Sequence, residues 1–248
     1  MPGILKRDRV RALTSKRVGQ YLLYGIGEVI LIFIGITLAV GFENSAEEKR
    51  ASELARGLLV GVQQDLDANA TELEGNIEID ETFLASLTRV LAHLDTSSAW
   101  PDSLSVELEN AMHWSSPFLS TSGYEGLKQA GLHRVPDEEL RTAIVRLFES
   151  RYGFLLGDHD RGMWEFTATV LRPLLGSEIV RTDKGGTTTG ALAPRDYGAT
   201  RERGVLRTAL LEQQNFLISG LELRQEILAE TLALRRLIDE FATNDGLD

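Results

Sequence analysis

The sequence predicts an all-α protein in which one N-terminal transmembrane helix continues into an elongated antiparallel helical bundle. Three observations predict this class: an unbroken apolar stretch near the N-terminus, apolar residues at helical spacing through most of the remaining chain, and no stretch with the alternating pattern of a half-buried strand. The chain has 248 residues, 43% hydrophobic and 25% charged, which is typical of a folded protein and excludes wholesale disorder. We therefore expect a basic cytoplasmic tail at residues 1–17, a transmembrane helix at 18–42 and an extracytoplasmic helical domain at 43–248.

The charge is distributed unevenly along the chain. The formal net charge is −11, but the first 17 residues carry six basic side chains and one acidic one. From residue 43 onward there are 20 basic and 35 acidic residues, which gives −15. Such an acidic surface disfavours nucleic acid, because binding there depends on basic residues that displace counterions. The absence of cysteine excludes disulfides, thiolate metal sites and cysteine nucleophiles, and we expect no cofactor.

The membrane anchor is predicted at residues 21–42, where Glu28 is the single ionisable side chain. A helix of that length spans about 33 Å, and the hydrocarbon core of a bilayer is about 30 Å thick. A buried helix of a soluble protein rarely runs this far without polar residues, and the apolar core of a cleaved signal peptide is shorter. We therefore interpret the segment as an uncleaved signal anchor. The excess of Lys and Arg before it predicts a cytoplasmic N-terminus and a periplasmic C-terminal domain in the bacterial inner membrane.

One face of this helix is predicted to pack against a second helix, and we call it the transmembrane seam. Its residues follow alternating steps of four and three, and they are Tyr21, Gly25, Glu28, Ile32, Gly35, Ala39 and Phe42. Small residues let another helix approach closely, and an ionised carboxylate in lipid is costly unless it finds a partner or a proton. The alternative is that Glu28 reaches toward the membrane surface and that the glycines reflect their general enrichment in membrane helices.

Residues 24–29 read Tyr-x-Ile-Gly-Glu-Val, and the apolar stretch after them contains Gly-Ile at residues 35–36. This segment resembles an uncharacterised bacterial family of single-pass membrane proteins, a domain of unknown function with a Tyr-x-Ile-Gly-Glu-Ile/Val transmembrane signature. Residues 121–131 are similar to the extramembrane motif of that family, an aromatic–Glu–x–Leu–Lys segment that ends in glycine, and residues 137–141 are also similar. The family usually continues with Gln, Asn and Trp after the span, where this chain has Gly-Phe-Glu-Asn-Ser. The resemblance implies a single-pass topology and no activity.

The membrane helix is expected to continue into a long helix over residues 43–95, which contain no proline and carry an apolar stripe. Residues 69–71 and Gly75 are the expected positions of any bend. A glycine-rich loop is predicted at residues 182–204, and a final helix at about residues 200–241 is expected to pack against the first long helix.

Shorter helices are predicted between these two long ones. Ser103 is expected to cap a helix that ends at Met112. Ser122, with Glu125 three residues later, matches a capping box for a helix that Gly131 closes. A further helix is expected to begin with Pro136 at its first position, and its predicted buried side is Leu140, Ile144, Leu147, Phe148, Leu155 and Leu156.

Few residues suggest chemistry. No pair of the four histidines has the spacing of helical metal ligands, and the sequence contains no HExxH, DxDxDG or GxSxG pattern. The segment Asp158–Asp160 with Glu165 is the most metal-like group, and we interpret it as a surface patch because adjacent helical residues point in different directions. The family-like motif contains Tyr124, Glu125 and Lys128. One interpretation is that they form a surface for a partner; the alternative is that Tyr124 packs in the core and that Glu125 and Lys128 form a surface ion pair.

Three functional hypotheses remain. The first is a non-catalytic accessory subunit of a larger membrane protein complex, such as an energy-transducing photosynthetic or respiratory assembly, which contacts other subunits through the seam and the acidic domain and also contacts the lipid bilayer. The second is a periplasmic sensory or ligand-binding input domain that signals through a partner, because only about 17 residues are expected in the cytoplasm. The third, an enzyme of unrecognised type, is disfavoured because no catalytic residue set is present in the sequence.

Overall fold

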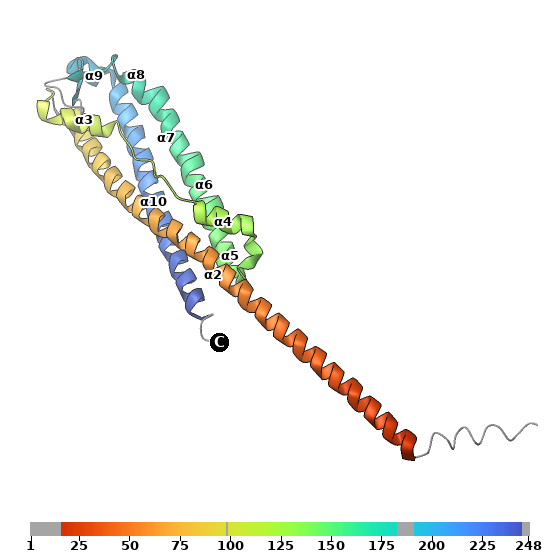
Figure 1. Cartoon of the computed structure of the whole chain (residues 1–248). Helices are drawn as coiled ribbons and strands as arrows, with labels where there is room; N and C mark the ends of the chain where they lie inside the picture. Colours follow the sequence, from red (N-terminus) through yellow and green to blue (C-terminus); the bar gives the residue numbers. More distant parts are fainter. Residues whose placement is uncertain (1–15, 98, 183–190, 245–248) are drawn as a thin grey trace, which may run out of the picture. The chain divides into compact units, whose positions relative to one another are not determined.

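The computed structural model of the chain describes residues 16–97, 99–182 and 191–244. These residues are almost entirely helical, with one pair of short strands, which confirms the all-α class (Figure 1). The chain forms two compact units, Met1–Leu54 and Ala55–Asp248. All but the last two residues of the predicted basic tail lie outside the described residues.

Helix α2 (Lys16–Thr96) contributes to both units. It contains one stretch, Tyr21–Gly41, that is long and apolar enough to cross a membrane and is not buried within the chain. The helix continues through residues 69–71 and Gly75, so the bends considered there do not interrupt it. One reason is that the Asn69 amide bonds to a distant segment rather than to its own backbone, where such side chains compete with helical hydrogen bonds.

In the second unit, α10 (Val205–Asn244) packs antiparallel to α2. Gln63 Nε2 donates to Asp239 Oδ1 at 2.6 Å, and Arg207 Nε donates to Asp95 Oδ1 at 2.6 Å, so the start of one helix faces the end of the other. The predicted packing of the two long helices is therefore confirmed. Helix α10 begins at Val205 rather than at residue 200, because Gly204 adopts φ +67° and separates it from α9 (Tyr197–Arg203).

A third helical layer packs beside α2 and α10, as Figure 1 shows. It alternates α-helical and π-helical segments: α5 (Glu138–Val145), η3 (Arg146–Arg151), α6 (Tyr152–Phe154), η4 (Leu155–His159), α7 (Asp160–Phe166), η5 (Thr167–Leu171) and α8 (Arg172–Leu174). Each π turn adds a residue to the helical repeat and changes which side chains face inward. Most of the predicted buried side is confirmed, but Leu156, which follows Leu155 in η4, is exposed.

The predicted loop at 182–204 is wrong at both ends. Strands β1 (Ile179–Thr182) and β2 (Ala191–Pro194) form an antiparallel hairpin in which Ile179 pairs with Pro194, and α9 follows. The strands have four residues each, too few to show an alternating pattern above background. Residues 183–190, at the centre of the predicted loop, lie outside the described residues.

The helix starts predicted from single residues are displaced by one or more positions. Ser103 lies inside the 3-10 turn η1 (Asp102–Leu104), and no side chain caps α3 (Ser105–Ala111). Helix α5 begins at Glu138 rather than at Pro136, and Asp137 caps it, because its carboxylate accepts the amide of Leu140 at 2.9 Å. Gly131 does end α4 (Ser122–Ala130), with φ +104°, and a 3-10 turn η2 (Leu132–Arg134) follows it.

The capping box predicted for α4 is also wrong, because the cap comes from another helix. Residue Thr121 precedes α4 without a side-chain cap bond, and the Asp65 carboxylate of α2 accepts the amides of Gly123 at 2.7 Å and Tyr124 at 2.9 Å. The hydroxyl of Ser122 donates to the same carboxylate at 3.1 Å. A carboxylate at a helix N-terminus also interacts favourably with the positive end of the helix dipole.

This cap is one part of a row of polar bonds between α2 and the extended segment 113–121 that precedes α4. The Asn69 side chain accepts the Ser120 amide at 2.6 Å and donates to the Ser120 carbonyl at 2.9 Å. Further along α2, Glu72 Oε1 accepts the amide of Phe118 at 3.0 Å, and Asp80 Oδ1 accepts the amide of Ser115 at 2.7 Å. We call residues 113–121 the crossing segment. Its backbone has no strand partner, so side chains of α2 supply many of its hydrogen bonds, and Gln213 and Arg224 of α10 donate to the carbonyls of His113 and Ser115.

Gly123 is required where α4 meets α2. Its Cα lies 3.2 Å from the Cβ position of Gly61, and a Cβ on Gly123 would overlap the Gly61 carbonyl. We expect Gly123→Ala to lower the free energy of unfolding by about 1–3 kcal/mol, because overpacking against backbone is relieved only by moving α4 away from α2. The measurement is denaturant unfolding of the detergent-solubilised chain.

Gly126→Ala is the matched control, because Gly126 is exposed on the same helix with open space around its Cβ position. It should be neutral or stabilise by up to about 1 kcal/mol, as alanine favours the helix. Equal effects of the two substitutions would contradict the close contact between α2 and α4.

Candidate functional site

The transmembrane seam lies on an uncovered part of the first unit. Among the described residues of that unit nothing lies within 4 Å of the Cβ positions of Gly25 and Gly35, so no described segment of this chain packs on them. The apolar side chains of Tyr21–Gly41 are exposed as well. The predicted seam is therefore open from Tyr21 to Ala39, and the side chain of Phe42 lies outside the described residues.

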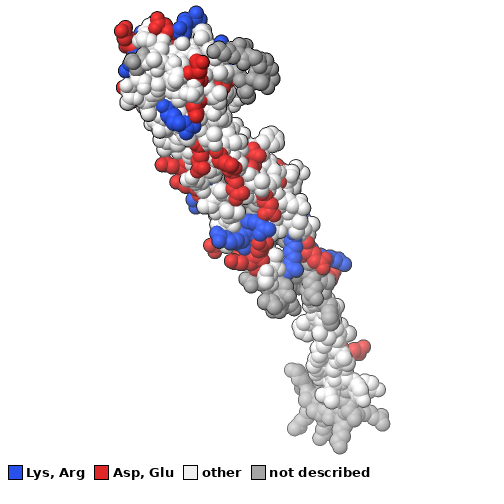
Figure 2. Space-filling view, turned by 90° about the vertical axis from the view of Figure 1, so that its left-hand side faces the viewer, with Lys and Arg blue, Asp and Glu red and all other residues white. Residues whose placement is uncertain are grey.

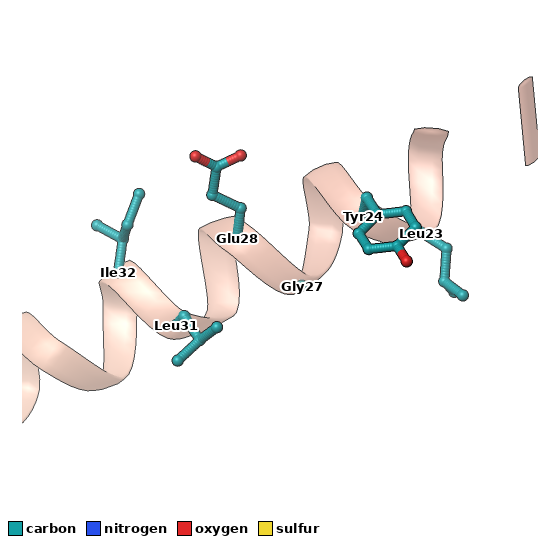
Figure 3. Close-up of a pocket in the computed structure, with 6 residues that line it drawn as sticks. All are labelled: Leu23, Tyr24, Gly27, Glu28, Leu31 and Ile32. Carbon is teal, nitrogen blue, oxygen red and sulfur yellow. The ribbon is translucent and has the colours of Figure 1, made fainter. Parts of the chain in front are cut away.

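Glu28 and Ile32 project from the same side of the helix (Figure 3), and Leu31, three positions after Glu28, borders the same face. Glu28 borders a shallow groove, whose lining is Leu23, Tyr24, Gly27, Glu28, Leu31 and Ile32. No described residue bonds the Glu28 carboxylate. In lipid this group needs a donor, and the side from which it projects is open for another helix to supply one.

The three residues of the family-like motif occupy two different environments. The Tyr124 ring is buried, 3% exposed, and stacks on Phe148 with ring centroids 4.6 Å apart. Its hydroxyl donates to Glu149 Oε1 at 2.7 Å, and the Lys128 ammonium contacts the same oxygen at 2.6 Å. Burial and the adjacent Glu149 carboxylate raise the pKa of Tyr124, so the hydroxyl keeps its proton as a donor.

Glu125 and Lys128 are exposed and 3.8 Å apart, which is the geometry of a weak surface ion pair. Tyr124 thus packs α4 onto η3, and of the three residues only Glu125 and Lys128 have their side chains at the surface. Sequence reasoning missed Glu149, which binds Tyr124 from 25 positions away and Lys128 from 21 positions away.

Two further surface features of the second unit lie outside the predicted sites. A groove of about 630 Å³ between α5 and α10 has an apolar floor, which includes Leu147, Leu234 and Leu237. Its rim carries three acids and one base: Glu138, Glu139, Glu230 and Arg146. Acidic side chains are also spread over the face of this unit that Figure 2 shows.

The second feature is Phe118, whose side chain is 90% exposed. The crossing segment holds it rigidly, because the amides of Phe118 and Ser120 both bond to α2. An exposed aromatic side chain on a fixed backbone is typical of the anchor residues of protein interfaces.

The most polar place in the interior is a cluster around Arg224, which is 1% exposed. Its Nη2 lies 3.2 Å from Asp160 Oδ1 and donates to the Ser115 carbonyl at 2.7 Å, and its Nη1 lies 3.4 Å from Asp80 Oδ2. The Ser116 hydroxyl completes the shell by donating to Asp160 Oδ2 at 2.5 Å. The cluster joins α10, α7, α2 and the crossing segment.

This arrangement corrects the interpretation of Asp158–Asp160 as a surface patch. Asp160 is buried and His159 lies 3.5 Å from it, because the π turn η4 directs these residues toward α10; only Asp158 is exposed. The carboxylate of Asp160 is occupied by Arg224 and Ser116. Among the described residues no group of three potential ligands could hold a metal ion.

Comparison with known protein families, curated proteins and solved structures finds no match to this chain. The resemblance of residues 24–29 and 121–131 to a single-pass family therefore stays a prediction. The structure adds a physical role to the second motif, since its glycine, tyrosine and lysine join α4 to α2 and η3.

The Arg224 cluster makes stability depend on pH when the arginine is removed. Burial raises the pKa of the Asp80 carboxyl above 3.8 even beside Arg224, so its ionised form is disfavoured by folding. Arg224→Met leaves two buried carboxylates without a cation and should lower the free energy of unfolding by about 3–5 kcal/mol at pH 7. The loss should diminish toward pH 4, since a raised folded pKa costs stability only as pH rises above the unfolded value.

Denaturant unfolding at pH 7 and pH 4 measures both effects. The control is Arg236→Met, because Arg236 is exposed on the same helix. A loss for Arg224→Met that is as large at pH 4 as at pH 7 would show that packing, rather than uncompensated charge, determines its effect.

Proposed function

We propose that this protein is a non-catalytic, single-pass accessory subunit of a larger bacterial inner-membrane complex. Its N-terminus is cytoplasmic, its helical second unit is periplasmic, and both the transmembrane seam and the acidic second unit contact other subunits. An energy-transducing assembly, photosynthetic or respiratory, is the host class that we favour. The observation that carries the proposal is a membrane-length helix with a charged, small-residue face that no described part of the chain covers.

The membrane helix supports contact with protein rather than with lipid alone. A helix that only anchors a domain has no need of a glutamate, which costs about 2.5–3.5 kcal/mol for an acidic side chain at the bilayer centre. Gly25 and Gly35 flank Glu28 on the seam and would let a donor-bearing helix approach its carboxylate closely. Since no described side chain of this chain bonds Glu28, the donor belongs to another chain.

The second unit supports a protein partner through charge and shape. The groove between α5 and α10 combines an apolar floor with a mainly acidic rim, and it suits an amphipathic helix with basic flanks. Phe118 offers a rigid aromatic anchor on the crossing segment. The non-catalytic part of the proposal rests on the sequence, which contains no recognisable catalytic residue set.

The proposed orientation predicts which positions a membrane-impermeant maleimide reaches. The chain has no cysteine, so single-cysteine variants report one position each. In spheroplasts, Glu74→Cys, exposed on α2, should be labelled without permeabilisation, whereas Thr14→Cys in the basic tail should be labelled only after it. The opposite pattern would reverse the topology, and labelling of neither position before permeabilisation would place both in the cytoplasm.

The seam predicts that a large side chain at Gly25 weakens association with other subunits and that a large side chain at Gly27 does not. Gly25→Leu should reduce the subunits that co-purify in mild detergent roughly 5- to 30-fold, equivalent to about 1–2 kcal/mol of helix packing. Gly27→Leu is the matched control, because Gly27 lies off the seam and both Cβ positions are open within the chain.

Glu28→Leu tests the buried charge in the same assay, and Phe118→Ser tests the extramembrane contact. Quantitative mass spectrometry of the co-purified proteins gives the readout and identifies the host complex. Unchanged association for both Gly25→Leu and Glu28→Leu, or purification of the chain alone from native membranes, would refute the proposal.

A further inference from the structure

The second unit contains a pocket that the proposed subunit role does not use. It has an open volume of about 300 Å³ and lies between α3, the crossing segment, α7–α8 and the β1–β2 hairpin. This volume is at the lower end of the range for small-molecule sites. No residue of the pocket belongs to the seam or to the groove between α5 and α10.

One wall of the pocket is aromatic and held in place. Trp114 meets Trp164 edge to face, with ring centroids 5.9 Å apart and an interplanar angle of 86°. The indole N–H of Trp114 donates to Thr167 Oγ1 at 3.2 Å, which fixes that ring. Trp164 is 56% exposed, although burying the large indole ring of a tryptophan is favourable in free energy. Leu192, which is buried, supplies part of the apolar lining.

The charged part of the pocket has an excess of cations. Arg181 Nη2 lies 3.6 Å from Glu109 Oε1, so these two charges compensate each other. His113 Nε2 lies 3.3 Å from the same oxygen. Arg172 also lines the pocket, and no described residue bonds its guanidinium. A cationic pocket is therefore present in a unit whose sequence, from residue 55 onward, has more acidic than basic residues.

From these observations we propose that the pocket binds a small organic anion, a monocarboxylate with an apolar or aromatic body. The carboxylate pairs with the Arg172 guanidinium, whose planar donors match two carboxylate oxygens. The apolar body lies against Trp164 and covers the part of its ring that is exposed. An inorganic anion fits less well, because it leaves the aromatic wall uncovered.

The test is isothermal titration of the full-length chain in detergent with phenylacetate, indole-3-acetate and hexanoate. At least one acid should bind saturably with a Kd below about 1 mM, and its primary amide should bind roughly tenfold more weakly because it lacks the charge. Arg172→Gln should weaken the acid by a similar factor and leave the amide unchanged. Trp164→Leu should weaken acid and amide alike, roughly 2- to 10-fold.

Arg161→Gln is the matched control, because Arg161 is exposed on α7 and does not line the pocket. Circular dichroism of each variant verifies that the fold is retained, which is expected since Arg172 and Trp164 are both exposed. The proposal is overturned if no acid binds with a Kd below about 1 mM or if amides bind as tightly as acids. It is also overturned if inorganic phosphate binds as tightly as the best acid, or if Arg161→Gln weakens binding as much as Arg172→Gln. Each outcome is independent of the co-purification result, so the subunit proposal and the ligand site succeed or fail separately.

Discussion

The arrangement of the second unit depends on one buried guanidinium. Arg224 lies within α10 and contacts Asp80 of α2, Asp160 of α7 and the backbone of the crossing segment. A charge without partners in this interior would be very costly, so the three helices and the segment must reach their positions together. Gly220 shows how closely the cluster is packed, because a Cβ there would lie 2.6 Å from Arg224 Nη1 and 2.7 Å from His159 Cε1.

The cluster also divides the hydrophobic interior. On α2, Asp80 lies between Leu73 of one apolar cluster and Leu87 of the other, and on α10, Arg224 lies between Ile227 and Leu217 of the same two clusters. A continuous apolar interface between two long helices could slide by a turn, since leucines recur at similar spacing along both. A polar layer permits only the register in which each charge meets its partner, which is the best-attested structural use of buried polar groups.

The parts of the fold that the sequence predicts are those determined by local pattern. Helices α2 and α10 follow from the spacing of leucines, and the end of α4 follows from Gly131, whose positive φ favours glycine. Two of the errors share a cause, namely a partner distant in sequence. The cap of α4 comes from Asp65, 58 residues before Gly123, and Asp160 is buried because of π turns and an arginine 64 residues later. The local sequence Asp-His-Asp indicates neither the π turns nor the distant arginine that bury Asp160.

The proposed ligand pocket and the core share the crossing segment. Trp114 forms a wall of the pocket, Ser115 and Ser116 bond to the Arg224 cluster, and the residues that follow bond along α2 as far as Asp65. A ligand could therefore move Trp114 only by straining hydrogen bonds in the core. Since the Trp114 indole is fixed to Thr167 and the serines are held by buried charges, we infer that the segment stays in place and that the pocket is preformed. The side chains free to adapt to a ligand are then Arg172 and Trp164, which lie at the exposed side of the pocket. Ligand binding there therefore does not require the contacts between the three helices to break.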